Sequence, residues 1–140
     1  MRSKAIVSAQ INRRIEFYDL DPMQIVWHGH YVKYFEEARC ALLDKIEYNY
    51  DQMDASGFYW PIVDMRVKYV SSAKFKQEIC IIANLVEYEN RLKMEYRVTG
   101  ASSQQVLTKG YTIQAAVDKE SGELQFVSPP ILSKKLANYL

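Results

Sequence analysis

The chain has 140 residues and a hydrophobic content of 49%, which is enough for one buried core but too short for two, so we expect a single domain over residues 1–140. The 18 Lys and Arg residues nearly balance the 17 Asp and Glu residues, and a net charge of +1 speaks against nucleic acid as a partner. Residues 1–10 lack the apolar stretch of a signal peptide, and no other segment could span a bilayer, so we expect a cytoplasmic protein.

The first predicted strand lies at Ile11–Tyr18, where apolar and charged residues partly alternate, and it ends at Asp21-Pro22. From about Tyr31 the apolar positions take the spacing of a helix, and this is the only long amphipathic helix that the sequence predicts. Its apolar stripe consists of Tyr31, Tyr34, Phe35, Ala38, Ala41, Leu42 and Ile46.

Four further strands are predicted after this helix. Alternation with a period of two marks Val63–Tyr69, Leu92–Val98 and Tyr111–Val117, and the first two of these should each have one wet face. Ile79–Val86 is nearly continuously apolar, which indicates a central strand. Ile131–Leu140 is predicted to form a short terminal helix. The order of one strand, one helix and four strands with short connections favours an α+β fold, in which an antiparallel five-stranded sheet packs against one long helix.

Two carboxylates, Asp19 and Asp21, lie on the connection between the first strand and the helix, where a rigid scaffold could hold them still. Strand alternation would point both side chains in the same direction. Two interpretations are open. Either the pair takes part in chemistry or Asp21 before Pro22 initiates a turn, and spacing alone favours the turn.

The segment Val26–Tyr31 leads into the helix, and the first N–H groups of a helix lack intrahelical partners and carry partial positive charge. These groups could polarise a carbonyl. His28 and His30 are either functional or ordinary loop histidines, and the pattern favours neither interpretation. Two His residues two positions apart beside a carboxylate match no recognised zinc spacing, so we predict no metal site.

Lysine and arginine residues at four strand or loop positions, namely Lys74, Lys76, Arg91 and Lys93, could meet phosphate groups. Exposed charges on strands usually form a solvated face, which is the default interpretation here. The sequence contains no serine hydrolase elbow and no glycine-rich phosphate loop.

Several stretches together resemble the hydroxybenzoyl-coenzyme A thioesterase family and its acyl-coenzyme A relatives. Around the connection and the helix these are Tyr18–Pro22, Ile25–His28, His30-Tyr31 and Tyr34–Arg39. The similarity continues through Trp60–Val63, Lys68-Tyr69, Lys76–Ile79 and Asp118 before Gly122, so it covers nearly the whole chain.

This resemblance implies a hotdog fold, a curved antiparallel sheet wrapped around a central helix, which usually dimerises so that active sites lie between subunits. It also implies that Asp21 acts on a thioester while the backbone N–H of His28 faces the acyl oxygen. The candidate substrate-binding residues are Trp27, His30, Tyr31, Glu36, Lys74 and Lys76. Where the family commonly has Gly two residues after the Pro, this chain has Gln24, whose side chain either narrows the acyl pocket or points outward.

We therefore predict an acyl-CoA thioesterase in which Asp21 is either a general base toward water or a nucleophile that forms a mixed anhydride. A thioester is already activated, so no metal or redox cofactor is needed, and CoA is part of the substrate. The predicted partners are an acyl-CoA or acyl-carrier-protein thioester and further copies of the chain, as a dimer or a dimer of dimers. Two alternatives stay open: a non-catalytic acyl-thioester binding module, and a hotdog dehydratase that releases no thiol.

Overall fold

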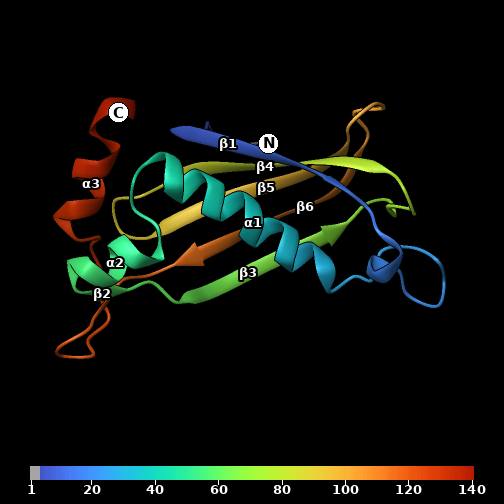
Figure 1. Cartoon of the computed structure of the whole chain (residues 1–140). Coiled ribbons are helices and arrows are strands. Elements are labelled where there is room, and N and C mark those ends of the chain that lie inside the picture. The colour runs from blue at the N-terminus through green and yellow to red at the C-terminus, as the bar shows by residue number, and fades with distance from the viewer. Residues whose placement is uncertain (1–3) are drawn as a thin grey trace.

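The computed structural model describes residues 4–140, which form a sheet with one long helix across one of its faces (Figure 1). The larger elements are β1 (Val7–Arg14), α1 (His30–Lys45), α2 (Tyr50–Ser56), β3 (Ile62–Tyr69), β4 (Glu78–Glu87), β5 (Leu92–Gly100), β6 (Val106–Gln114) and α3 (Pro130–Leu136). The short elements are the 3₁₀ helices η1 (Phe17–Asp19) and η2 (Ala137–Tyr139) and the strands β2 (Phe58–Tyr59) and β7 (Val117–Asp118).

The main sheet has five strands in the order β1-β4-β5-β6-β3, and every neighbouring pair is antiparallel. The helix α1 lies along one face of this sheet, with its long axis crossing the strands, as Figure 1 shows. The strands β2 and β7 form a separate two-stranded sheet beside α2. The predicted α+β architecture, a five-stranded antiparallel sheet around one long helix, is therefore confirmed.

The apolar stripe of α1 forms the centre of the core. Tyr34, Phe35, Ala38 and Leu42 are all almost completely buried. The ring of Phe35 is stacked on the ring of Tyr96 in β5, with 4.5 Å between the ring centroids. This close approach requires glycine at position 110 in β6, because a Cβ atom there would collide with the Phe35 ring and with the carbonyl oxygen of Arg66. The helix and the sheet are therefore in direct contact at this point.

The predicted central strand is an interior strand of the sheet. β4 lies between β1 and β5, and its side chains at Ile79, Ile81, Ala83 and Leu85 are fully buried on the helix side. The opposite face of β4 is half-buried. The near-continuous apolar run at residues 79–86 thus reflects a strand with hydrogen-bonded neighbours on both sides.

The first strand differs from its prediction, since β1 covers Val7–Arg14 and not Ile11–Tyr18. Pairing with β4 ends where Arg14 lies opposite Glu78. Beyond that point Glu16 and Asp19 cap each other's backbone N–H groups and close the 3₁₀ turn η1. This local capping, and not strand pairing, determines the conformation of residues 16–19.

The edge strand β3 lacks the single dry face that its alternation predicts. Of its eight residues, only Val67 is half-buried and the others are exposed. Val63 is 56% exposed and Met65 is 43% exposed. Within the described chain, β3 pairs with β6 along one side and its other side has no strand neighbour. An apolar strand edge of this kind is a surface that associates readily with another chain.

The last predicted strand, Tyr111–Val117, begins and ends too late: β6 runs over Val106–Gln114, and Val117 belongs to the short strand β7. The other differences concern short elements. The helix α2 was not predicted, although Asn49 and Gln52 form a capping box at its start and Gly57 ends it with φ of +92°. The terminal helix was predicted and is present as α3, followed by η2. No helix among residues 4–140 is long and apolar enough to cross a membrane.

Candidate active site

The connection between β1 and α1 contains a tight turn at Asp21. The Gln24 N–H donates to the carbonyl oxygen of Asp21, and the Asp21 N–H donates to the carbonyl oxygen of Ile25, both at 2.9 Å. The Oδ1 atom of Asp21 accepts a hydrogen bond from the Met23 N–H at 2.8 Å. The turn interpretation of Asp21 is thus correct, yet the carboxylate keeps Oδ2, which receives no hydrogen bond from the described residues. Asp21 can therefore both shape the turn and act on a ligand.

Gln24 completes this turn in a left-handed conformation, with φ of +62°. A type I turn followed by one left-handed residue is a common way to join two antiparallel segments, and glycine is favoured at the left-handed position. Leu20 and Val26 form the antiparallel bridge on either side of the loop. The position where the family resemblance implies Gly is thus one that requires positive φ, and Gln24 adopts it with an exposed side chain.

Asp19 and Asp21 lie in different environments, so the prediction that they point in the same direction is wrong. Asp19 is 2% exposed; its carboxylate accepts from the Glu16 N–H at 2.8 Å and lies 3.7 Å from the guanidinium of Arg13. Its carbonyl oxygen accepts from the Trp27 N–H at 2.9 Å. Burial and the nearby Asp19 carboxylate raise the pKa of Tyr34 well above its usual range, so that hydroxyl stays protonated. Asp19 therefore fixes the connection between β1 and α1 through these contacts.

The helix α1 begins at His30, one residue before the predicted start, with Gly29 at the N-cap position and no side-chain cap. The His30 N–H donates to the carbonyl oxygen of Trp27 at 3.0 Å, whereas the N–H groups of His28 and Gly29 have no acceptor among residues 4–140. The carbonyl oxygen of His28 accepts from the Tyr69 hydroxyl at 2.9 Å. Free backbone donors at the positive end of a helix are suited to an oxyanion.

Trp27 covers this helix start. Its ring lies over Gly29, where a Cβ atom would collide with the indole, so glycine is required for the close approach. The ring centroids of His28 and His30 each lie 5.2 Å from that of Trp27. Trp27 is 45% exposed, which leaves part of the indole open to a ligand.

A cavity of about 270 Å³ opens beside the turn and the helix start. It is lined by Asp21, Met23, Ile25, Val26, His28, Tyr31 and residues 69–72. The structure thus brings together three of the predicted site residues: Asp21, His28 and Tyr31. The Tyr31 hydroxyl accepts from the Ala73 N–H at 3.3 Å, and burial raises the pKa of this tyrosine.

The other predicted site residues do not line this cavity. Trp27 and His30 lie next to it through their ring contacts, and His30 is also stacked on Tyr34. Glu36 is an exposed residue of α1 whose carboxylate lies 3.7 Å from Arg39. Lys74 and Lys76 lie on the exposed loop before β4, where the backbone of Lys74 bridges to Ile25 and Lys76 has φ of +68°.

Sequence reasoning missed the contribution of the segment after β3. Tyr69 was identified as an alternating strand position and as part of the family resemblance but not as a site residue, although its hydroxyl fixes the carbonyl of His28. Ser71 and Ser72 also line the cavity and carry no signal in the sequence. Among the residues that the structure describes, no group of three or more His, Cys, Asp or Glu side chains could hold a metal ion.

A family model described as the Thioesterase-like superfamily matches residues 15–136. The chain belongs to this superfamily. It is 23% identical to a protein of Synechocystis sp. named "Putative esterase", over 91% of this chain and 77% of that protein. It is 27% identical to a "Putative acyl-CoA thioesterase" of Bacillus subtilis, but that match spans only 59% of either chain, less than two thirds of the relative.

A similar solved structure is that of a 1,4-dihydroxy-2-naphthoyl-CoA thioesterase from Synechocystis, with a TM-score of 0.83 and 15% identity over 94% of this chain and 97% of the other. The predicted family, the hotdog fold and the class of enzyme, a thioester hydrolase, are confirmed for this member of the Thioesterase-like superfamily.

The strain at Gln24 gives a testable expectation. A residue with a Cβ in the left-handed region costs about 1–2 kcal/mol, and glycine removes this cost. The greater freedom of glycine in the unfolded chain takes back about 0.5–1 kcal/mol of the stability gained. We expect Gln24→Gly to raise the free energy of unfolding by about 0.5–1 kcal/mol in urea denaturation. Gln24→Ala keeps the Cβ and is the control. A Gly variant no more stable than the Ala variant would contradict the left-handed assignment.

Proposed function

We propose that this chain hydrolyses acyl-CoA thioesters in the cavity beside Asp21. The observation that carries the proposal is that Asp21 and His28 line one cavity, and that the His28 N–H has no acceptor within residues 4–140. A thioester carbonyl needs a base or nucleophile on its carbon and donors on its oxygen. Asp21 supplies the first and the unpaired N–H of His28 supplies the second.

Two routes use these groups. In the first, Asp21 takes a proton from water, whose oxygen attacks the thioester carbon; the C–S bond then breaks and the proton passes to the departing sulfur. In the second, Asp21 attacks the carbon itself, CoA thiolate leaves, and water hydrolyses the resulting mixed anhydride. Both routes place negative charge on the carbonyl oxygen, where the His28 N–H at the positive end of α1 would stabilise it.

The proposal also covers the thiol that carries the acyl group and the cellular location of the reaction. The names of the Bacillus subtilis relative and the Synechocystis thioesterase both specify CoA thioesters, which favours acyl-CoA over an acyl-carrier-protein thioester. CoA is then a substrate, and the two routes use no metal or redox cofactor. We place the reaction in the cytoplasm, in a single domain that spans the chain.

A homodimer through the β3 edge is the assembly that the fold favours. The unpaired side of β3 presents backbone donors and acceptors together with exposed Ile62, Val63 and Met65. Association of two such edges in antiparallel fashion satisfies the backbone groups of both chains and buries the apolar side chains. Tyr69, at the end of β3, also lines the cavity beside Asp21, which we call the acyl cavity. The strand edge and this cavity are therefore adjacent.

We expect Asp21→Asn to lower thioester hydrolysis by about 10²–10⁴-fold, the loss typical of a positioned acid-base group. The amide oxygen of Asn can still accept from the Met23 N–H, so the fold should be unchanged. Asp19→Asn should lower turnover much less, because the buried Asp19 carboxylate contacts Arg13 and lies outside the cavity. Thiol release from a panel of acyl-CoA esters measures the turnover of both variants.

The assignment of Asp21 is wrong if the order of the two variants is reversed. A parent protein that binds these esters without releasing thiol is a binding module or a dehydratase.

Two substitutions distinguish the backbone N–H of His28 from its imidazole. His28→Ala should keep much of the activity, since the N–H remains. His28→Pro removes that donor and should cost at least about 10²–10³-fold in turnover. Circular dichroism and light scattering must first show that the Pro variant matches the parent. If a folded His28→Ala variant is as inactive as Asp21→Asn, the imidazole itself takes part in the reaction.

Light scattering should report a dimer for the parent chain, and Met65→Glu should shift it toward monomer by placing a charge on the apolar side of β3. Lys134→Glu is the control, because this exposed residue belongs to α3 and not to the β3 edge, so it should leave the dimer intact. A fully active parent monomer at working concentrations would contradict the proposal.

A further inference from the structure

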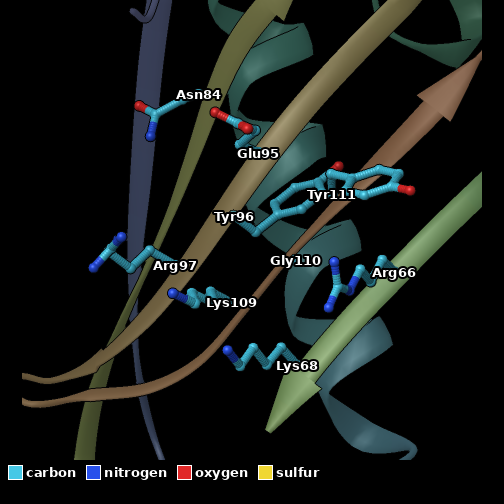
Figure 2. Close-up of a pocket in the computed structure, with 9 residues that line it drawn as sticks. All are labelled: Arg66, Lys68, Asn84, Glu95, Tyr96, Arg97, Lys109, Gly110 and Tyr111. Carbon is cyan, nitrogen blue, oxygen red and sulfur yellow. The ribbon is translucent and has the colours of Figure 1, made fainter. Parts of the chain in front are cut away.

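The face of the sheet opposite α1 carries a second hollow, of about 490 Å³. Figure 2 shows this face with α1 behind the sheet. The hollow is lined by Arg66, Lys68, Asn84, Glu95, Tyr96, Arg97, Lys109, Gly110 and Tyr111, which come from β3, β4, β5 and β6. Four of these residues are cationic and only Glu95 is anionic.

The register of the sheet places three of these cations in one row. Lys68 of β3 is directly opposite Lys109 of β6, and Lys109 is directly opposite Arg97 of β5. In the next row, Arg66 lies opposite Tyr111, which in turn lies opposite Glu95. Arg66, Lys68 and Arg97 project from alternate strand positions onto the same face, as Figure 2 shows.

This arrangement has an energetic cost for the free protein. Like charges directly opposite each other on neighbouring strands destabilise a sheet, and here two such pairs share the side chain of Lys109. Four of the 18 Lys and Arg residues of the chain line this hollow, together with one acidic residue. A bound anion would remove the repulsion.

We propose that this outer hollow binds a ligand with two or more phosphate groups. Neighbouring strands lie about 4.8 Å apart, so the row from Lys68 to Arg97 spans about 10 Å, more than a single carboxylate can bridge. Arg and Lys side chains are the usual partners of phosphate oxygens. The volume of the hollow lies within the range of about 300–1,000 Å³ that small-molecule sites occupy.

The outer hollow is separate from the acyl cavity. Lys68 and Tyr69 are consecutive in β3, so their side chains point to opposite faces of the sheet, and only Tyr69 lines the acyl cavity. Phosphate binding here does not depend on thioester hydrolysis. The phosphates could come from a free nucleotide or from the nucleotide end of CoA itself, and the experiment distinguishes these sources.

The test is calorimetric titration of the full chain at low ionic strength with pyrophosphate, with adenosine 3′,5′-bisphosphate and with CoA. The variants are Lys109→Gln and Lys68→Gln, and Lys134→Gln on α3 is the matched control. Pyrophosphate and the bisphosphate should bind the parent and the control equally, and each variant in the hollow should bind at least about tenfold more weakly. Binding should also weaken as salt is added.

A second measurement detects the repulsion directly. Without ligand and at low salt, Lys109→Gln should raise the melting temperature by about 2 °C, whereas loss of a merely structural lysine would lower it. If CoA binds the hollow and the KM for acyl-CoA rises in Lys109→Gln, the phosphates are those of the substrate. If the bisphosphate binds while that KM is unchanged, the ligand is a separate nucleotide.

Three results would overturn the proposal. The first is no heat of binding with 1 mM pyrophosphate or bisphosphate at low salt, a concentration about tenfold above a weak Kd of 0.1 mM. The second is binding that Lys68→Gln and Lys109→Gln leave unchanged. The third is binding of polyglutamate in place of either phosphate ligand, which would make the hollow a docking surface for an acidic protein. Circular dichroism checks the fold of each variant, and light scattering checks its dimer, because Lys68 lies on the strand β3 whose edge pairs in the proposed dimer.

Discussion

The packing of Phe35 onto the middle of the sheet is the contact on which the rest of the structure depends. Its ring is parallel to that of Tyr96 and covers the backbone of Gly110, where no side chain would fit. This contact fixes the rotation of α1 about its axis. Tyr31, one turn earlier on the same face, therefore meets Tyr69 at the end of β3, with 5.7 Å between ring centroids. The position of the acyl cavity therefore depends on the rotation of α1 about its axis.

The connection before α1 gains its rigidity from contacts at both ends. The Trp27 N–H is bound to the carbonyl oxygen of Asp19, and the carbonyl of His28 is bound to the Tyr69 hydroxyl. The His30 N–H also holds the carbonyl of Trp27. A carbonyl lies in one peptide plane with the N–H of the next residue, so these contacts orient the N–H groups of His28 and Gly29. Donors that are already oriented stabilise a developing charge without the cost of reorganisation. The turn at Asp21 places the carboxylate against the same cavity by independent hydrogen bonds.

The spacing of apolar residues predicted the helix and strands whose side chains face the core. It failed where local hydrogen bonds determine the backbone conformation. The stripe from Tyr31 to Leu42 predicted α1 to within one residue, because each apolar position has to meet the sheet. The first strand was misplaced because residues 16–19 follow a capping interaction and not the sheet. The sequence motif indicated Asp21 as a site residue, and Asp21 lines the cavity. The contact between Tyr69 and His28 was not indicated, since it joins residues 41 positions apart and depends on strand register.

Strand β3 separates two kinds of contact by the alternation of its side chains. Met65 and Tyr69 point to the face that carries α1, whereas Arg66 and Lys68 point to the outer face. Pairing of two β3 edges continues the sheet and leaves the outer hollow open on both copies. Stacking of two dimers through their outer faces would instead bring two rows of three cations together, and Coulomb repulsion opposes this. Anions bound between the two layers would remove this repulsion, so in a dimer of dimers built through that face assembly and phosphate binding would be linked.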